Sequence, residues 1–151
     1  AVYKLFWDEF SSWYLEMVKP AYGSPIDATS YNQTLAFFET LLKMLHPFMP
    51  FITEEIWQAL PHEGEFLMLS KWPEYNEKFS FPAEEEAMQT VIEAITAIRA
   101  RRNEMNVAPS KKVHYTVSTA NEASFTAGIP FFTRLASASD VTIVPADAAI
   151  D

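Results

Sequence analysis

The stretch "MLHPFMPFITEEIWQAL", residues Met44 to Leu60, has apolar residues at helical spacing but carries two prolines near its centre. Proline lacks a backbone N–H and pushes the residue before it out of the α region, whereas the first turn of a helix accepts it readily. His46 is therefore predicted to end one helix, and a second helix is expected to begin with proline in its first turn. The corner between them is predicted to enclose seven apolar side chains: Leu45, Phe48, Met49, Phe51, Ile52, Ile56 and Trp57.

Amphipathic helical patterns lie on both sides of this corner. Apolar residues recur three and four apart from Val2 to Val18 and again from about Ser30 to Leu45. Glu54 and Glu55 suit the positive end of the helix dipole after the prolines. The longest helix is expected from Ala83 to about Met105. The fold class is therefore predicted to be mainly α, with a helical bundle over residues 1–109.

The end of the chain has a different pattern. Val113 to Thr119 is β-branched and alternating, which predicts a strand, and "DVTIV" at residues 140–144 predicts a second one. Residues 121–137 between them are weakly helical, and Gly128 and Pro130 are expected to interrupt that helix. A small α+β appendage is thus expected over residues 110–151. Two strands and one helix bury little, so it is expected to lean on the bundle or on further chain.

Composition limits the class of function. The 151 residues contain no cysteine and three glycines, which excludes thiol chemistry and a glycine-rich phosphate loop. No apolar run reaches the ~20 residues of a membrane span, and a chain without cysteine suits the reducing cytoplasm. The three histidines are scattered without metal-ligand spacing. No catalytic residue, metal site or cofactor is predicted within the chain.

Charge is distributed unevenly. The net charge is −9, yet five of the eleven basic residues lie within positions 99–112, beside one acid. On a helical wheel, the apolar stripe of the long helix continues into this basic segment. These cations could complement the negative end of the helix dipole and form salt bridges, or they could offer bidentate guanidinium groups to a phosphate backbone. Under the second interpretation, the candidate RNA-binding residues are Arg99, Arg101, Arg102, Asn106, Lys111 and Lys112.

Three motifs resemble a known enzyme family. "LLKMLHPFMPFITEEIWQAL", residues 41–60, resembles the anticodon-domain corner of the class I aminoacyl-tRNA synthetases for valine, isoleucine and leucine. "FWDEFSSWYLEMVKP", residues 6–20, resembles the helix before that corner in the same enzymes. "IRARRNEMNVAPSKKV", residues 98–113, resembles the valine enzymes in particular, which carry a similar run through the positions of Arg102, Met105, Asn106, Val107, Pro109, Ser110, Lys111 and Lys112. The final strand–helix–strand part resembles the family only loosely.

The resemblance implies that this chain is the anticodon-binding, tRNA-docking part of a valine–tRNA ligase. The parent enzyme would use ATP with magnesium to attach valine to its tRNA in the cytoplasm. Its catalytic and editing domains would lie outside this chain, which begins without a methionine, and a coiled-coil arm would follow Asp151. The implied partners are the valine tRNAs and the rest of the synthetase chain, with no membrane.

Two alternatives stay open. The corner motif suits the isoleucine enzyme as well, although the basic run favours valine. A helical protein–protein interaction module without an RNA role is the other alternative, and the net charge of −9 supports it.

Overall fold

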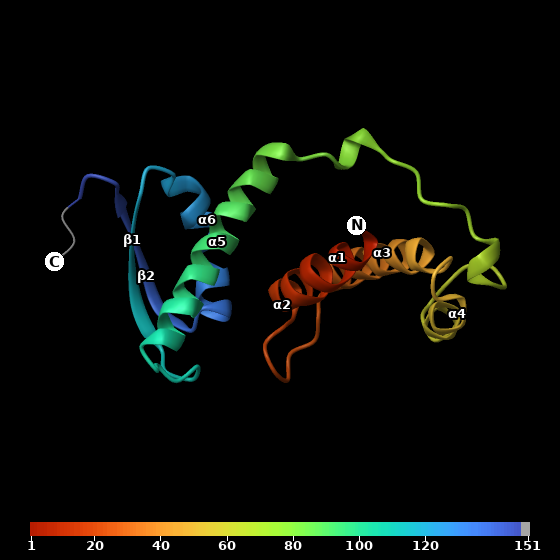
Figure 1. The fold of residues 1–151 in the computed structure, drawn as a ribbon, viewed down its shortest axis with the longest axis horizontal. Helices are drawn as coiled ribbons and strands as arrows, with labels where there is room; N and C mark the ends of the chain where they lie inside the picture. The colour runs from red at the N-terminus through yellow and green to blue at the C-terminus, as the bar shows by residue number, and fades with distance from the viewer. Residues whose placement is uncertain (149–151) are drawn as a thin grey trace. The chain divides into compact units, whose positions relative to one another are not determined.

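A computed structural model of the chain describes residues 1–148 and divides it into two compact units, which begin at Ala1 and Lys78 (Figure 1). This division differs from the expected domains of 1–109 and 110–151, because the long helix packs with the strand–helix–strand part. The domain boundary at residue 109 stays a prediction, and the last three residues of the appendage lie outside the described residues. The mainly α fold class is confirmed.

The first unit is helical. Its first helical segment joins α1 (Val2–Lys4), a π-helical stretch (Leu5–Tyr14) and α2 (Leu15–Val18), so the helix predicted from Val2 to Val18 is present. The π-helical geometry was not foreseen. The hydroxyls of Ser11 and Ser12 donate to carbonyls five residues earlier, each at 2.8 Å, and these bonds match the π-helical spacing.

The proline corner forms as predicted. Helix α3 (Ala28–Leu45) ends at His46, and α4 (Pro50–Gln58) begins with proline in its first turn. The imidazole Nδ1 of His46 lies 2.8 Å from Oγ1 of Thr53, so a hydrogen bond ties the two helices across the corner. The Thr53 hydroxyl donates to the carbonyl of Met49 at 2.8 Å, so the hydroxyl of this residue, which is only 1% exposed, is hydrogen-bonded.

The predicted filling of the corner is wrong for four of the seven side chains, which are exposed: Phe48, Met49, Phe51 and Ile52. Phe48, for example, is 75% exposed, whereas Trp57 is 2% exposed. The reason is the starting point of α4, which turns Thr53 and Trp57, four residues apart on one face, toward α3. Trp57 forms a buried cluster with Leu42 of α3 and with Leu67 of a 3-10 turn (Leu67–Leu69).

Glu54 fastens that turn to α4. The backbone N–H of Leu67 donates to both carboxylate oxygens, at 3.1 and 3.0 Å, and the Gln58 amide donates to one of them at 2.9 Å. The bond from Gln58, followed by that from Leu67, holds the pKa of Glu54 below its ordinary value although desolvation opposes the shift. Glu54 therefore has a specific partner in addition to the helix dipole.

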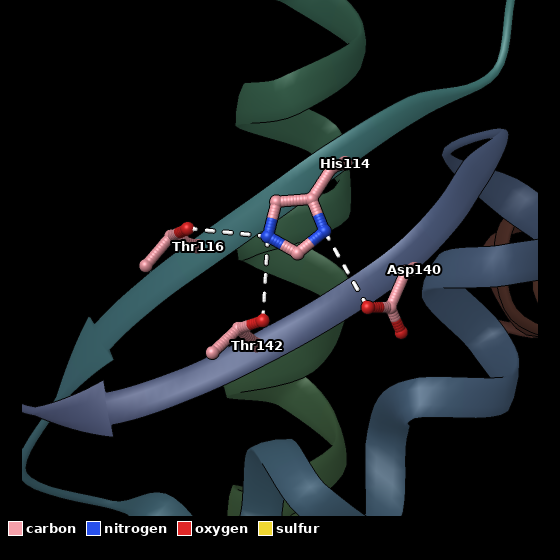
Figure 2. A network of polar contacts seen from close by, with 4 residues as sticks. All are labelled: His114, Thr116, Asp140 and Thr142. Carbon is pink, nitrogen blue, oxygen red and sulfur yellow. Dashed lines mark hydrogen bonds and ion pairs between the residues drawn. The ribbon is translucent and has the colours of Figure 1, made fainter. Parts of the chain in front are cut away.

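The second unit combines two helices with a two-stranded parallel sheet. A 3-10 turn (Glu77–Phe79) precedes α5 (Pro82–Glu104), after which β1 (Val113–Thr119), α6 (Glu122–Leu135) and β2 (Ala138–Pro145) form a β–α–β arrangement. The strands pair from Val113 opposite Ala138 to Thr119 opposite Pro145. Both helices cover one face of the sheet (Figures 1 and 2), so the appendage leans on the long helix.

The expected interruption of the second helix is wrong. Helix α6 runs through both Gly128 and Pro130. Gly128 is buried where α6 meets α5, and a Cβ atom added there would lie 2.8 Å from Cγ2 of Val91. The glycine therefore permits a close approach of two helices and does not break one. Within residues 1–148, none of the helices combines the length and apolar character that crossing a membrane requires.

Candidate nucleic-acid interface

The basic segment surrounds the C-terminal end of α5. The helix ends in a Schellman motif, in which the N–H of Val107 donates to the carbonyl of Arg102 at 2.9 Å and that of Asn106 to the carbonyl of Asn103 at 3.0 Å. Asn106 has a φ of 52°, a left-handed conformation that asparagine tolerates better than most residues. Asn106 thus closes the helix and turns the chain toward β1, a role that its sequence context could have indicated.

Arg102 holds the connection between α5 and β1. Its Nη2 donates to the carbonyls of Ala108 at 2.8 Å and Lys111 at 2.6 Å, and its Nη1 donates to the hydroxyl of Tyr115 at 2.8 Å. The Tyr115 hydroxyl donates in turn to the carbonyl of Ala136 at 2.9 Å. One guanidinium therefore links α5, the connection, β1 and the turn after α6.

The other two arginines of the segment differ in their surroundings. Arg99 donates from Nε to the carbonyl of Leu135 at 2.7 Å, where a cation complements the negative end of α6. Arg101 pairs with Glu104 at 3.0 Å, and its side chain is 72% exposed. Such an exposed pair contributes little to stability, so Arg101 can exchange its partner at small cost.

Lys111 and Lys112 are exposed at the end of the connection, immediately before β1. Neither lysine takes part in the ion pairs formed among residues 1–148. The backbone under them is fixed, because the Lys111 N–H donates to the carbonyl of Ala108 at 3.0 Å and the Lys111 carbonyl accepts from Arg102. Two ammonium groups therefore project from a short, ordered connection.

A cavity of about 440 Å³ lies at the C-terminal ends of α5 and α6. Nine of residues 1–148 line it: Arg99, Arg102, Asn103, Val107, Pro109, Arg134, Leu135, Ala136 and Ser137. Arg134, in the last turn of α6, was not among the residues selected from the sequence. The sequence offers only a weak signal for Arg134, because this residue stands apart from the basic cluster at 99–112 and is the one Lys or Arg after Lys112.

A polar network occupies the uncovered face of the sheet (Figure 2). His114 Nδ1 lies 3.5 Å from Oδ2 of Asp140, and its Nε2 lies 3.5 Å from the Thr116 hydroxyl and 3.3 Å from that of Thr142. These distances are long and all four side chains are exposed, so each interaction is weak. No group of His, Asp and Glu side chains among residues 1–148 has the arrangement needed to hold a metal ion.

Comparison with known proteins identifies the family. The family model described as "Anticodon-binding domain of tRNA ligase" matches residues 1–117. The chain belongs to this family. The match extends from the first helix of this anticodon-binding domain through the basic segment and into β1, and it confirms the resemblance drawn from the three motifs.

Three relatives of this anticodon-binding domain are each named "Valine--tRNA ligase". The protein of Porphyromonas gingivalis is 51% identical over 130 residues, which are 85% of this chain and 15% of that protein. Those of Parabacteroides distasonis and Phocaeicola vulgatus are 48% and 47% identical over 93% and 95% of the chain, and each match covers 16% of the relative. The chain thus spans about one sixth of the length of these relatives.

Proposed function

We propose that this anticodon-binding domain is the tRNA-docking part of a valine–tRNA ligase. The parent protein would attach valine to the valine tRNAs in the cytoplasm, with ATP and magnesium supplied to a catalytic domain outside this chain. The observation that carries the proposal is the identity of 47–51% to proteins named as valine–tRNA ligases over 85–95% of the chain. The basic segment, whose residue pattern resembles the valine enzymes, lies inside the aligned family region.

The basic segment divides into contact and positioning residues in this proposal. Lys111, Lys112 and Arg101 contact phosphate oxygens of the tRNA, because all three are exposed and either lack an ion pair within residues 1–148 or hold a weak one. Arg102 and Asn106 act through the backbone, since the first fastens the connection and the second closes α5. Phosphate contacts of this kind orient the RNA without reading its bases.

The salt dependence of tRNA binding tests the lysines. In the full-length protein, Lys111→Gln with Lys112→Gln should weaken tRNA binding and reduce the slope of log K against log salt by ~2, about one for each lost phosphate contact. The control is Lys4→Gln with Lys19→Gln, which removes the same charge from the first unit. An unchanged slope in the Lys111 and Lys112 variant, or an equal change in the control, would remove these lysines from the interface.

A second experiment separates the alternatives for the parent protein. Valine-dependent ATP–pyrophosphate exchange by the full-length protein is the expected result, and exchange with isoleucine alone would favour the isoleucine enzyme. Failure of the full-length protein to bind any tRNA at low salt would favour a protein–protein interaction module. The net charge of −9 is compatible with RNA binding only because the basic residues are clustered.

A further inference from the structure

We infer that the cavity at the C-terminal ends of α5 and α6 is a binding subsite for a phosphate group, held by Arg99 and Arg134 beside the guanidinium of Arg102, which keeps its structural role. The inference rests on the proposed function for the source of that phosphate, which is the backbone of the docked tRNA. It adds Arg134 and a second contact region to the exposed lysines of the connection. Its physical basis, the charge and geometry of the cavity, is independent of the proposed function.

The composition of the cavity is unusual for this chain. The chain has four arginines and twenty acidic residues, yet three of the arginines and none of the acids among residues 1–148 line this one cavity. Guanidinium groups match phosphate oxygens through paired, parallel N–H bonds, which an ammonium group does not offer. A cavity that is lined by three such groups, and by no carboxylate from the described part of the chain, favours an anion.

The three arginines come from α5 and α6, and two of them, Arg99 and Arg102, are oriented before any ligand binds. Arg102 is fixed by its bonds to Ala108, Lys111 and Tyr115. Arg99 is fixed at Nε by the carbonyl of Leu135, the residue that follows Arg134 on α6. Because these bonds set the side-chain positions in advance, binding of a phosphate requires little further ordering of them.

Charge complementarity to the helix ends does not account for all three arginines. Each helix C-terminus carries a partial charge of roughly −0.5, so the two ends of α5 and α6 contribute about −1. Among the described lining residues, the three guanidinium groups contribute three positive charges and no side chain contributes a negative one, so these residues outweigh the two helix ends. Val107, Pro109 and Leu135 add an apolar wall, which suits a phosphate carried by a ribose better than a free inorganic ion.

Two binding measurements test the subsite, and both use Arg134→Gln, Arg134→Lys and the charge-matched control Lys4→Gln. Arg134 is exposed, and the thermal midpoint of unfolding is measured for each variant, so that a loss of binding at an unchanged midpoint is assigned to the cavity. In the first measurement, inorganic phosphate is titrated into the ¹⁵N-labelled 151-residue chain while the arginine Nε–H signals are followed. Saturable chemical-shift changes of Arg99 and Arg102 are expected. The phosphate affinity derived from them should be at least tenfold weaker in Arg134→Gln and partly restored in Arg134→Lys. Equal phosphate binding by the wild type and Arg134→Gln would overturn the subsite.

The second measurement identifies the source of the phosphate. In the full-length protein, Arg134→Gln should lower the salt slope of tRNA binding by ~1, while Lys4→Gln should not change it. An unchanged slope together with lost phosphate binding would overturn tRNA as the source and leave a site for a free phosphate-bearing small molecule. If the wild type binds no tRNA at low salt, the proposed function fails, and the phosphate titration still decides the subsite by itself.

Discussion

Replacing Arg102 with lysine tests whether its guanidinium holds the connection between α5 and β1. Lysine keeps the positive charge but lacks the planar fork that reaches several acceptors at once. The variant therefore removes the geometry of the contact and preserves the electrostatics. We expect the second unit to lose stability while the salt slope of tRNA binding stays unchanged.

The size of the loss follows from the three hydrogen bonds of Arg102, which measure 2.6–2.8 Å. A hydrogen bond to a charged group contributes about 1.5–3 kcal/mol, and the lower end applies here because the carbonyls of Ala108 and Lys111 are exposed. Lysine can retain one of the three bonds. The expected loss in the free energy of unfolding is therefore roughly 2–3 kcal/mol for two bonds.

The assay can separate the two units because all four tryptophans, Trp7, Trp13, Trp57 and Trp72, lie in the first one. Urea unfolding followed by tryptophan fluorescence then reports the first unit, and backbone amide signals of β1 and α6 report the second. Arg102→Lys should shift only the second transition. Tyr115→Phe removes the hydroxyl that lies between Arg102 and Ala136. In a double-mutant cycle, its effect on the free energy of unfolding should be coupled to that of Arg102→Lys by ~0.5 kcal/mol or more.

The matched control is Arg101→Lys, on the same helix but exposed and paired only with Glu104. Its effect should stay within about 0.5 kcal/mol, as for surface substitutions in general. A loss for Arg102→Lys that is no larger than this would refute the role of the guanidinium as a structural link. A flatter salt slope in Arg102→Lys would instead place Arg102 itself in direct contact with the RNA.

Two further substitutions test the packing of each unit. Gly128→Ala gains about 1 kcal/mol of helix preference but forces a Cβ to within 2.8 Å of Val91, so we expect a net loss of ~1–2 kcal/mol in urea unfolding. That loss should shrink when Val91→Ala is added, and a stabilising single variant would contradict the close approach of α5 and α6. Glu54→Gln should destabilise the first unit at pH 7. Because folding lowers the pKa of Glu54, its contribution is present above the ordinary value of 4.5 and is lost as the pH falls through the folded value. The difference from the wild type should therefore narrow in melts between pH 5 and pH 3, whereas a constant difference, or one shared by the exposed Glu55→Gln, would contradict the assigned carboxylate contact.

The basic segment shows how far sequence reasoning reaches at a candidate site. The clustering of Arg99, Arg102 and Lys111 is visible in the sequence, and the structure places Arg102 in contact with the backbone of Lys111 just beyond the end of α5. The different surroundings of the two arginines are not visible there, because some of their partners come from distant parts of the chain. The carbonyl of Leu135, which accepts from Arg99, lies 36 residues away, and no local pattern identifies it.

Elements whose causes are local could be predicted from the sequence. Proline restricts its own backbone and that of its neighbour, so the helix–corner–helix at Met44 to Leu60 follows from the positions of its two prolines. Alternation of side chains is equally local, and β1 therefore matches the predicted Val113–Thr119. Packing explains why Thr53 is buried while Phe48 is exposed, and why Gly128 permits a helix contact where an interruption was expected. Those outcomes depend on which faces meet across the fold, and packing between distant segments sets that choice without leaving a signature in any single window of sequence.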